Sequence, residues 1–488
     1  MEDATVEVRS AGGAVSFRAP AVPAAKADRR LVVVSNRVVP GGVEKPDTGG
    51  LAVAIRAALQ EHGGIWFGWS GRVDDSASGE ALIAEHGPVT CATLDLTRRD
   101  FDEYYIGYAN RVLWPLFHFR GSLVEFSRRD LTGYRRVNRM FAEKLAPMLA
   151  ADDLVWVHDY HLIPLGAELR RLDQQQRIGF FLHIPFPPAE LLRVLPDHQN
   201  LVKALCAYDL IGFQTGPDLH GFRDYLLRWV GAEDLGRGRL RAFGRVVQAQ
   251  VFPIGIDTAQ LAAQAVVADT NRHMRRLRHS LGDRALMIGV DRLDYSKGLP
   301  SRFRAYSHLL QTAPETRGRV VMMQIAPPSR SEIPEYQEVR KSLASIAGQI
   351  NSRFGEFDWT PLRYINKAFA HPILTGFFRA SRIGLVTPLR DGMNLVAKEY
   401  VASQPAEDPG VLVLSCFAGA AHELAEAVLV NPYDVEGMAE GMRQGLEMPL
   451  GERRERWSAL MKTIERNDIT HWRETFLRAL ATGGAPGE

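Results

Sequence analysis

The sequence predicts an α/β fold of two Rossmann-like domains that face a central cleft. Three observations support this fold class. Apolar runs of strand length alternate with helical or loop sequence along most of the chain, which is typical of a parallel, doubly wound sheet. The alternation breaks once, near the middle of the chain, and then resumes as a second series. The length of 488 residues is enough for two substantial cores.

The first series begins after residues 1–29, which are rich in Ala, Gly and Pro and are predicted to form a disordered extension. Leu31–Ser35 is a β-branched run typical of a strand, Gly41–Gly50 is a loop, and Leu51–His62 has the pattern of an amphipathic helix. This N-terminal domain is expected to cover residues 30–255. Its further strands are predicted at Leu154–His158, Ile178–His183, Leu210–Gln214 and Val246–Phe252.

The second series follows the stretch Pro-Ile-Gly-Ile-Asp at 253–257, which interrupts the alternation and marks the predicted domain boundary. A charged helical region, Gln260–Leu281, opens the C-terminal domain, which is expected to cover residues 256–465. A last helical segment spans about Leu450–Leu480, and residues 466–488 are expected to hold a C-terminal helix and tail. Strands of this domain are predicted at Ala285–Val290, Arg319–Ile325, Arg363–Ile365, Ile383–Thr387, Val411–Ser415 and Ala427–Val430.

The composition excludes several classes of function. The 59 Lys and Arg and 57 Asp and Glu side chains leave a net charge of +2, which gives no reason to expect a nucleic-acid or membrane partner. Cys91, Cys206 and Cys416 are too few and too far apart for a disulfide framework or a Cys-based zinc site, so a reducing compartment fits best. No apolar run approaches the roughly 20 residues that span a bilayer, and no secretory signal opens the chain. We therefore expect a cytoplasmic protein.

The stretch Val290–Gly298 places two cations five residues apart directly after a predicted strand. Arg292 and Lys297 should lie on the loop that leaves the carboxyl end of this strand, where open α/β sheets bind ligands. Solvated loop cations are the ordinary alternative. Because cations in such a loop suit phosphate, the stretch indicates a phosphate site.

A second block, Leu385–Tyr400, has the same order of an apolar strand, a Pro/Gly turn and a segment able to open a helix. The free backbone N–H groups of a helix start near Met393–Leu395 would make an anion site, and Glu399 lies about one turn further along. A diphosphate could be held between the two loops, with a carboxylate that reaches a sugar hydroxyl.

The two blocks closely resemble the signature of the bacterial trehalose-6-phosphate synthases, which are retaining glycosyltransferases of the GT-B architecture in glycosyltransferase family 20. The resemblance runs from about Leu31 to Trp472 and implies that the last helical segment packs back across both domains. Further motifs carry it: Val-Ser-Asn-Arg (34–37), Gly-Gly-Leu (49–51), Trp-Phe-Gly-Trp-Ser-Gly (66–71), His-Asp-Tyr-His (158–161) and Phe-Leu-His-Ile-Pro-Phe (181–186).

The resemblance implies a donor site for a nucleotide diphosphate sugar. Arg292 and Lys297 would grip the diphosphate, and His183 would contact the primary hydroxyl of the sugar. The glycine-rich loop at Gly49 and Gly50 would close over the donor. The other donor contacts implied are Phe369 near the nucleobase, Asp391 at a sugar hydroxyl, Met393, Asn394, Leu395 and Val396 at the helix start, and Glu399 at the ribose. The segment Arg363–Phe369, which corresponds to the region that contacts the nucleobase, does not identify the base. UDP-, GDP- and ADP-glucose therefore remain possible donors.

The resemblance also implies an acceptor site. Arg37, Tyr105, Trp114 and Arg330 match the positions that cradle the phosphate of glucose 6-phosphate, and Asp159 matches the residue that meets both sugars. A phosphate dianion suits two guanidinium groups together with a phenol and an indole N–H. By themselves, Tyr105 and Trp114 are ordinary candidates for core or surface aromatics.

Other interpretations of these residues remain open at this point. His158 and His161 have a spacing that suggests metal ligands, but no further ligand set completes a site, so we predict no metal. Asp391 is also placed to cap a helix N-terminus, a role compatible with sugar binding. Phe369 could equally be a core residue.

The resemblance implies a retaining glucosyltransferase that moves glucose from a nucleotide diphosphate glucose to glucose 6-phosphate and forms α,α-trehalose 6-phosphate. The alternatives are a glucosylglycerol-phosphate synthase, a pseudo-glycosyltransferase or a catalytically silent sugar-phosphate sensor. No carboxylate is obviously placed as a nucleophile, although Asp159 and Asp391 could form a glycosidase-like pair, and we favour the front-face mechanism. We expect small-molecule substrates, no cofactor and a homo-oligomer.

Overall fold

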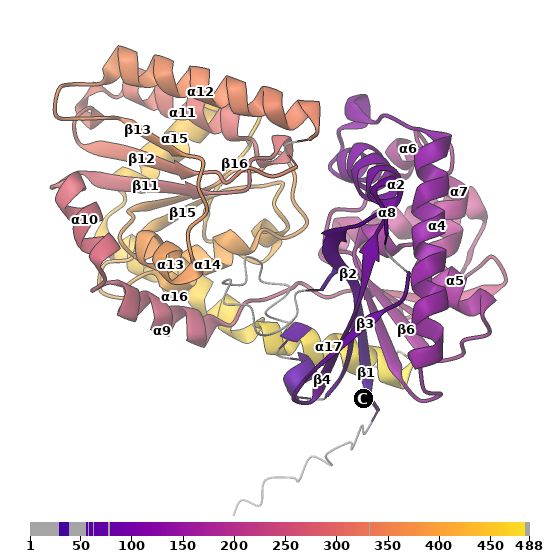
Figure 1. The fold of residues 1–488 in the computed structure, drawn as a ribbon. Coiled ribbons are helices and arrows are strands. Elements are labelled where there is room, and N and C mark those ends of the chain that lie inside the picture. The colour runs from indigo at the N-terminus through magenta and orange to yellow at the C-terminus, as the bar shows by residue number, and fades with distance from the viewer. Residues whose placement is uncertain are drawn as a thin grey trace, which may run out of the picture.

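The computed structural model describes residues 29–38, 55–56, 58–61, 63–76, 79–330 and 332–483. The described chain forms two lobes, each built on its own sheet, and a helix near the C-terminus returns from the second lobe to the first (Figure 1). The predicted extension up to residue 28 and the loop at Gly49 and Gly50 lie outside the described residues. The α/β class with two Rossmann-like domains is confirmed.

The first lobe holds a 10-stranded sheet in the order β3-β4-β2-β1-β5-β6-β7-β10-β9-β8. Its central strands, from β4 to β10, pair in parallel. The switch point of this sheet lies between β1 and β5, because the strands that follow β1 in the chain are added on one side and those that follow β5 on the other. The strands are β1 (Leu31–Arg37), β2 (Gly64–Val73), β3 (Leu82–His86), β4 (Val89–Leu96), β5 (Leu154–His158), β6 (Arg177–Phe181), β7 (Leu210–Phe213), β8 (Glu233–Gly236), β9 (Arg239–Ala242) and β10 (Arg245–Val251).

The edges of this sheet differ from the parallel sheet that the sequence predicts. Strand β3 is antiparallel to β4, and β9 is antiparallel to both β8 and β10. Two-residue connections explain the difference, since only antiparallel neighbours can be joined so tightly. In each of the two turns that flank β9, both linking residues have positive φ, which suits the twist of a hairpin. These residues are Arg237 and Gly238 in one turn, and Phe243 and Gly244 in the other.

Helices of the first lobe cover this sheet (Figure 1). The longest are the π-helix η1 (Phe101–Leu113) and α4 (Arg128–Leu145), which pack on each other. Short helical segments complete the lobe: α2 (Arg98–Asp100), α3 (Trp114–Phe117), η2 (Gly121–Leu123), η3 (Ala146–Met148), η4 (Tyr160–Leu162), α5 (Leu165–Arg171), α6 (Ala189–Leu192), α7 (His198–Leu205), α8 (Gly216–Tyr225) and η5 (Leu226–Val230).

The second lobe holds a 6-stranded sheet in the order β13-β12-β11-β14-β15-β16, and all of its strand pairs are parallel. This is the order of a dinucleotide-binding fold, with its switch point between β11 and β14. The strands are β11 (Ala285–Val290), β12 (Val320–Ile325), β13 (Leu362–Ile365), β14 (Ile383–Val386), β15 (Val411–Ser415) and β16 (Val428–Val430). The helices are α9 (Thr258–Ala268), α10 (Arg272–Leu281), η6 (Tyr295–Lys297), α11 (Leu299–Thr312), η7 (Pro314–Thr316), α12 (Pro334–Phe354), α13 (His371–Arg379), α14 (Leu395–Ser403), η8 (Gly419–His422), α15 (Val435–Glu447), α16 (Leu450–Arg466) and α17 (Ile469–Thr482).

The chain crosses between the lobes twice, at residues 252–257 and again after α16. The two crossings lie side by side, because Ile469 N–H donates to the Ile256 carbonyl at 3.1 Å. Helix α17 then packs on the first sheet, where the Phe476 ring lies against Gly179 and Gly212. A methyl group at either glycine would lie within 3 Å of that ring. Small residues on β6 and β7 therefore make room for the returning helix.

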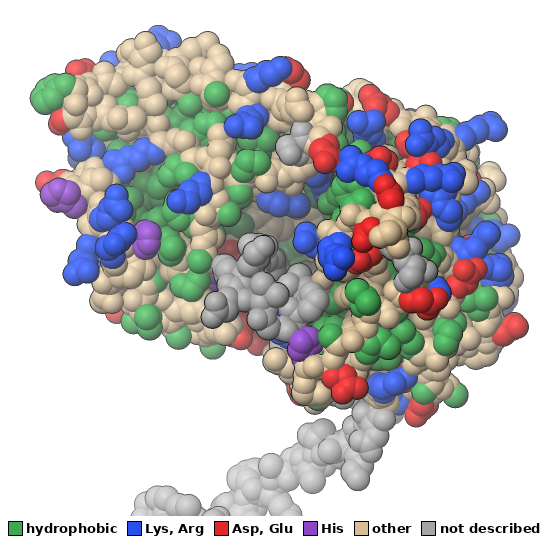
Figure 2. Space-filling model, in the orientation of Figure 1, with side chains coloured by type: hydrophobic (Ala, Val, Ile, Leu, Met, Phe, Trp, Pro, Cys, Tyr) green, Lys and Arg blue, Asp and Glu red, His purple; other side chains and the backbone are tan. Residues whose placement is uncertain are grey.

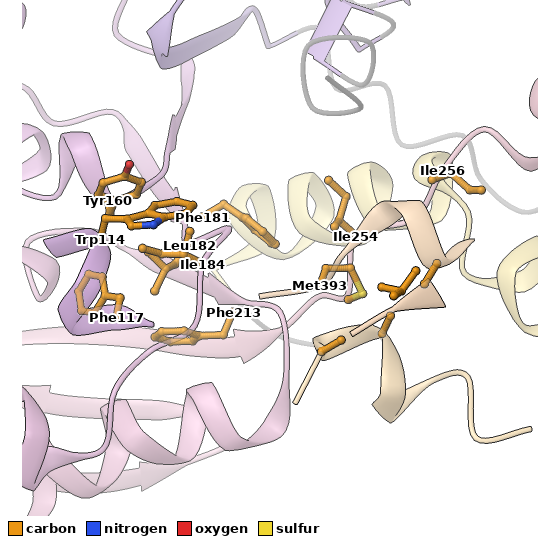
Figure 3. Close-up of a cluster of buried hydrophobic side chains, with 14 of the residues drawn as sticks. Trp114, Phe117, Tyr160, Phe181, Leu182, Ile184, Phe213, Ile254, Ile256 and Met393 are labelled. Carbon is orange, nitrogen blue, oxygen red and sulfur yellow. The ribbon is translucent and has the colours of Figure 1, made fainter. Parts of the chain in front are cut away.

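Buried apolar side chains also fill the junction between the lobes. Leu182 and Ile184 lie on the first-lobe side, and Met393 lies beside Ile254 on the other (Figure 3). None of the described helices is long and apolar enough to cross a membrane.

Candidate active site between the two domains

The predicted site residues follow the strands at the two switch points. In the first sheet, Arg37 ends β1 and Asp159 follows β5; in the second, Lys297 lies after β11 and Asp391 after β14. Ligands of open α/β sheets bind at such points, outside the carboxyl ends of the strands. Figure 2 shows a hollow between the lobes with Lys and Arg side chains on its walls. The structure thus places loops of both domains around one cleft.

The donor side of the cleft is organised around an ion pair between Lys297 and Asp391. Burial alone would raise the pKa of the Asp391 carboxyl, but Lys297 beside it lowers that pKa below its usual value. Asn394 donates its side-chain amide to the same carboxylate at 2.9 Å. The carboxylate is therefore ionised and held in place from two sides.

Helix α14 opens at this ion pair. Its N-cap residue is Asn394, in a left-handed conformation with φ 75°, and no side chain caps the helix. The alternative role of Asp391 as an N-cap is therefore wrong, because its carboxylate is taken by the side chains of Lys297 and Asn394. The first backbone N–H groups of the helix, at Leu395 and Val396, are those that a helix leaves without an intrahelical partner. They suit an anion.

Trp114 brings together two cations of the other domain. The Arg330 guanidinium lies 3.9 Å and the Arg292 guanidinium 5.6 Å from its ring centre, which is the geometry of cation–π contacts. Arg330 also donates to the Tyr160 hydroxyl at 3.2 Å, so the contact between the domains is polar as well as aromatic. Arg292 itself is exposed. Both arginines reach the first domain from the second.

Arg330 is held firmly on its own side. One of its N–H groups reaches Tyr336 at 2.7 Å and Asp294 at 3.3 Å, and Tyr336 donates to the same Asp294 carboxylate at 3.0 Å. The guanidinium is almost fully buried, with 6% of its side chain exposed. A buried cation needs such partners. The arrangement orients Arg330 before any ligand arrives.

The remaining acceptor residues belong to one aromatic layer. The Tyr105 ring stacks on the His161 ring at 5.8 Å and contacts the Trp69 ring at 5.6 Å. Arg37 lies 6.0 Å from that Trp69 ring, at the outer edge of the layer. The His161 ring also contacts the Tyr160 ring. Tyr160 in turn contacts the Trp114 ring and accepts a hydrogen bond from Arg330. The four residues predicted to cradle the acceptor phosphate are thus connected through Trp69, His161 and Tyr160, although they are far apart in the sequence.

Asp159 sits between the two subsites in an uncommon conformation with φ 76°. Burial raises the pKa of its carboxyl to about 6, while hydrogen bonds from backbone N–H groups and the charges of Arg330 and Arg292 act in the opposite direction. One of those N–H groups belongs to His183, at 3.2 Å. A non-glycine residue with positive φ is a feature of strained functional sites.

His183 belongs to the first domain and lies where the lobes touch. A side chain at Gly392 of the second domain would overlap its backbone carbonyl, so the two loops meet backbone to backbone. Burial lowers the pKa of the His183 imidazole to about 3, which keeps it neutral. Its Nε2 lies 3.1 Å from Nδ1 of His158. Among the described residues, no group of three or more His, Cys, Asp or Glu side chains could hold a metal ion.

Phe369 lies just before α13, and Glu399 lies on α14. The Phe369 ring is half-buried and meets the Phe377 ring edge-on at 5.4 Å, so it is partly a packing residue. The Glu399 carboxylate lies 3.7 Å from the His371 imidazole and raises the pKa of that imidazole above its usual value. His371 is the first residue of α13, so its contact with Glu399 connects the start of α13 to α14.

Four residues of the site were not identified from the sequence. Asp294 and Tyr336 orient Arg330, Tyr160 carries the contact between the domains, and His118 lies near Asp294, Asp391 and Lys297. Burial lowers the pKa of the His118 imidazole to about 4, and its Nδ1 lies 2.7 Å from the Trp114 carbonyl. Asp294 could have been found, because it stands between Arg292 and Lys297 in the same loop. Tyr160 stands beside Asp159 in the His-Asp-Tyr-His motif and could have been found in the same way, whereas His118 and Tyr336 lie outside the motifs quoted above.

Two Rossmann-like domains with a cation-lined cleft between their strand ends are the architecture of the GT-B glycosyltransferases. The model of glycosyltransferase family 20 matches residues 35–482, and the chain belongs to this family. A trehalose-6-phosphate synthase of Sinorhizobium fredii (strain NBRC 101917 / NGR234) is 52% identical over 460 residues, which cover 92% of this chain and 98% of the relative. The enzyme class predicted from the sequence is therefore confirmed.

Solved structures agree with the fold and the family. An α,α-trehalose-phosphate synthase (UDP-forming) from Burkholderia vietnamiensis superimposes with a TM-score of 0.92 at 50% identity, over 94% of this chain and 98% of that one. A second UDP-forming synthase, from Burkholderia xenovorans in complex with glucose-6-phosphate, has a TM-score of 0.89 at 48% identity and covers 92% of this chain and 100% of its own.

Proposed function

We propose that this enzyme transfers glucose from UDP-glucose to the anomeric hydroxyl of glucose 6-phosphate and so forms α,α-trehalose 6-phosphate with retention of configuration. One observation carries the proposal: Arg330 of the second domain is buried against Trp114 and Tyr160 of the first, and contacts through His161 and Trp69 connect this group with Tyr105 and Arg37. Two guanidinium groups with a phenol and an indole suit a phosphate monoester. The named activities of the relatives support the same acceptor.

The donor site occupies the other half of the cleft. Arg292 and Lys297 suit the diphosphate, and the N–H groups at the start of α14 suit the same anion. Asp391, fixed by Lys297 and Asn394, is placed to accept a hydrogen bond from a hydroxyl of the transferred sugar. The UDP-forming relatives support uridine as the base. We assign the ribose hydroxyls to Glu399, and Phe369 to the edge of the base site.

Transfer is proposed to occur on one face of the sugar. The bond from the anomeric carbon to the leaving phosphate oxygen breaks while the bond to the acceptor oxygen forms, and the acceptor proton passes to the departing oxygen. Arg292 and Lys297 stabilise the negative charge that grows on the diphosphate. A glycosidase-like pair of Asp159 and Asp391 is disfavoured, since the Asp391 carboxylate is already engaged by the side chains of Lys297 and Asn394. We propose that no metal ion or cofactor takes part.

The test is to incubate the protein with glucose 6-phosphate and, separately, UDP-, GDP- and ADP-glucose, and to identify the sugar product by mass spectrometry and NMR. The proposal predicts α,α-trehalose 6-phosphate, with UDP-glucose used best. A different linkage, a glycerol- or cyclitol-derived product, or no turnover with any donor would contradict it. A homo-oligomer and a cytoplasmic location stay predictions from the sequence; light scattering of the purified protein tests the first.

A further inference from the structure

A second histidine lies directly behind His183. His158 is the last residue of β5, and its side chain is fully buried. Its Nδ1 faces Nε2 of His183 at 3.1 Å, and the two rings lie 5.3 Å apart and nearly parallel. Nothing in the proposed chemistry uses His158. The contact can, however, determine which ring nitrogen of His183 carries hydrogen.

Both imidazoles are neutral, since burial lowers the pKa of His158 well below its usual value and that of His183 to about 3. A neutral imidazole has one N–H donor and one acceptor nitrogen. The contact between Nδ1 and Nε2 can thus form in two ways: either His158 donates to His183, or His183 donates to His158. Each choice fixes the proton on the other nitrogen of both rings.

The surroundings of His158 decide between them. Its other nitrogen, Nε2, is buried without a hydrogen-bond partner, and so are the indole N–H groups of Trp156 and Trp472. The Trp156 and Trp472 rings lie 4.5 and 6.3 Å from the His158 ring. Indoles only donate. A proton on His158 Nε2 would add a third orphaned N–H beside two others, and a buried N–H without an acceptor is rarer than an unpaired acceptor. We therefore expect His158 Nε2 to carry a lone pair and no hydrogen.

We propose that His158 is a positioning residue: it donates its Nδ1–H to Nε2 of His183 and holds His183 as the Nδ1–H tautomer. His183 then has one N–H group available to a ligand, at Nδ1. With the donor role proposed above, on which this inference rests, the primary hydroxyl of the glucose accepts that hydrogen bond. The side chain is also held in one orientation by a buried partner, as precise sites require.

The tautomer can be measured on the unmodified protein. With ¹⁵N-labelled histidine, the ring nitrogen that carries hydrogen is identified by NMR, and the His183 signals are assigned by their loss in His183→Gln. The inference predicts hydrogen on Nδ1 of both His158 and His183. Hydrogen on Nε2 of His183 would overturn it. This result does not depend on turnover, so it is separate from the product assay that tests the proposed function.

Kinetics of three variants test the consequence. The readout is the ratio of kcat/KM for UDP-glucose to that for UDP-xylose, which lacks the primary hydroxyl group. His158→Leu should lower this ratio by about tenfold, whereas His158→Asn, whose amide N–H can replace Nδ1–H, should keep it within about threefold of the original. Phe476→Leu is the matched control: Phe476 packs on Trp156 and Phe181, which are neighbours of the two histidines, and in the described part of the chain it has no ring contact with either histidine, so the ratio should not change.

The controls also define failure. An unchanged ratio in His158→Leu would overturn the positioning role, as would equal losses in His158→Asn and His158→Leu. A loss in Phe476→Leu as large as that in His158→Leu would show that packing, not the hydrogen bond, sets the preference, and would likewise overturn it.

Discussion

Two cations of the cleft are held in ion pairs before any substrate is present. Lys297 is paired with Asp391, and Arg330 with Asp294. Three of the site residues, Asp159, Arg330 and Asn394, have positive φ angles although they are not glycines. Such conformations persist where the surroundings enforce them, and they cluster at functional sites. Preorganised charge of this kind favours a transition state in which negative charge grows on a phosphate.

The cations at the diphosphate should matter mainly for the rate. Replacing Arg292 or Lys297 with Ala should lower turnover at saturating donor by about 10²–10³-fold, because each removes a preorganised partner of the leaving group. Steady-state kinetics with saturating glucose 6-phosphate measure this effect. Lys341→Ala is the control, since Lys341 is exposed on α12 and pairs only with Glu338 among the contacts described. Near-native turnover in either cleft variant would refute its role.

Asp159 should give the enzyme an acidic limb in its pH profile. Burial raises the pKa of its carboxyl to about 6, so the ionised form that accepts a hydrogen bond from a sugar is lost as the pH falls through that value. The same shift makes the carboxyl favour the folded state in its protonated form, so its contribution to stability decreases as the pH rises from about 4 to about 6. We expect kcat/KM to fall below about pH 6.

The control for this limb is Asp159→Asn, because the phosphate of glucose 6-phosphate also titrates at about pH 6. A fall of kcat/KM at low pH that remains in Asp159→Asn is due to the phosphate. The part of the fall that is lost in this variant is due to Asp159. Superimposable profiles for the two proteins would contradict the assignment.

At the residue scale, the sequence predicted side chains that directly follow strands better than side chains that meet across domains. Arg292 and Lys297 were placed by the strand before them. The contact of Arg330 with Tyr160 depends on how the two sheets approach, and that of His158 with His183 depends on the pairing of β5 with β6. No local pattern encodes either contact. Resemblance to the family grouped Tyr105 with Trp114, but not Asp294 or Tyr336, which hold Arg330 from behind.

At the scale of elements, the site is built from loops at the carboxyl ends of parallel strands. Several buried strands were predicted well, since β5, β11 and β15 begin and end at the residues expected, but β2 and β4, whose central residues are buried, were not predicted. The hairpin strands β3, β8 and β9 were also not predicted; they are four or five residues long and have at most half of their residues buried. A region predicted as one helical stretch, Gln260–Leu281, is two helices, α9 and α10. Asn271 caps the second of them.

The loop after β14 should tolerate no side chain at Gly392. A methyl group there would overlap the His183 carbonyl, so Gly392→Ala must push apart the loops that carry the donor site. We expect a fall in turnover of tenfold or more, on the order of the loss caused by small displacements of catalytic groups. Gly348→Ala is the control, since nothing lies within 4 Å of a methyl group there on α12, and it should slightly raise the melting temperature. Wild-type turnover in Gly392→Ala would contradict the close approach.

At the scale of the whole molecule, the cleft is completed by both domains together. The chain crosses between them twice, and buried Lys398 of the second domain donates to the Ile254 carbonyl at 2.8 Å and pairs with Glu423. Helix α17 ties the end of the chain to the first sheet. The acceptor site therefore exists only when Arg330 of one domain meets Trp114 and Tyr160 of the other.

Because arginine and lysine supply the positive charge at the diphosphate, the account predicts activity without a divalent metal. Turnover should be unchanged within about twofold after exhaustive chelation at constant ionic strength, since the leaving group is stabilised by fixed cations. Initial rates with and without chelator measure this. Loss of activity with rescue by one specific metal ion would overturn the mechanism and reopen the role of His158 and His161.

The most direct test of the account is acceptor choice, measured together with donor affinity. If Arg37 and Arg330 bind the phosphate, unphosphorylated glucose leaves both guanidinium groups without a partner, at a cost of about 1.5–3 kcal/mol for each charged hydrogen bond. The unmodified enzyme should therefore use glucose 6-phosphate far better than glucose. Arg330→Ala should lose about 10- to 150-fold of that preference while its affinity for UDP-glucose stays nearly the same. Equal use of the two acceptors by the unmodified enzyme, or weaker donor binding instead of weaker acceptor binding in Arg330→Ala, would contradict the assigned site.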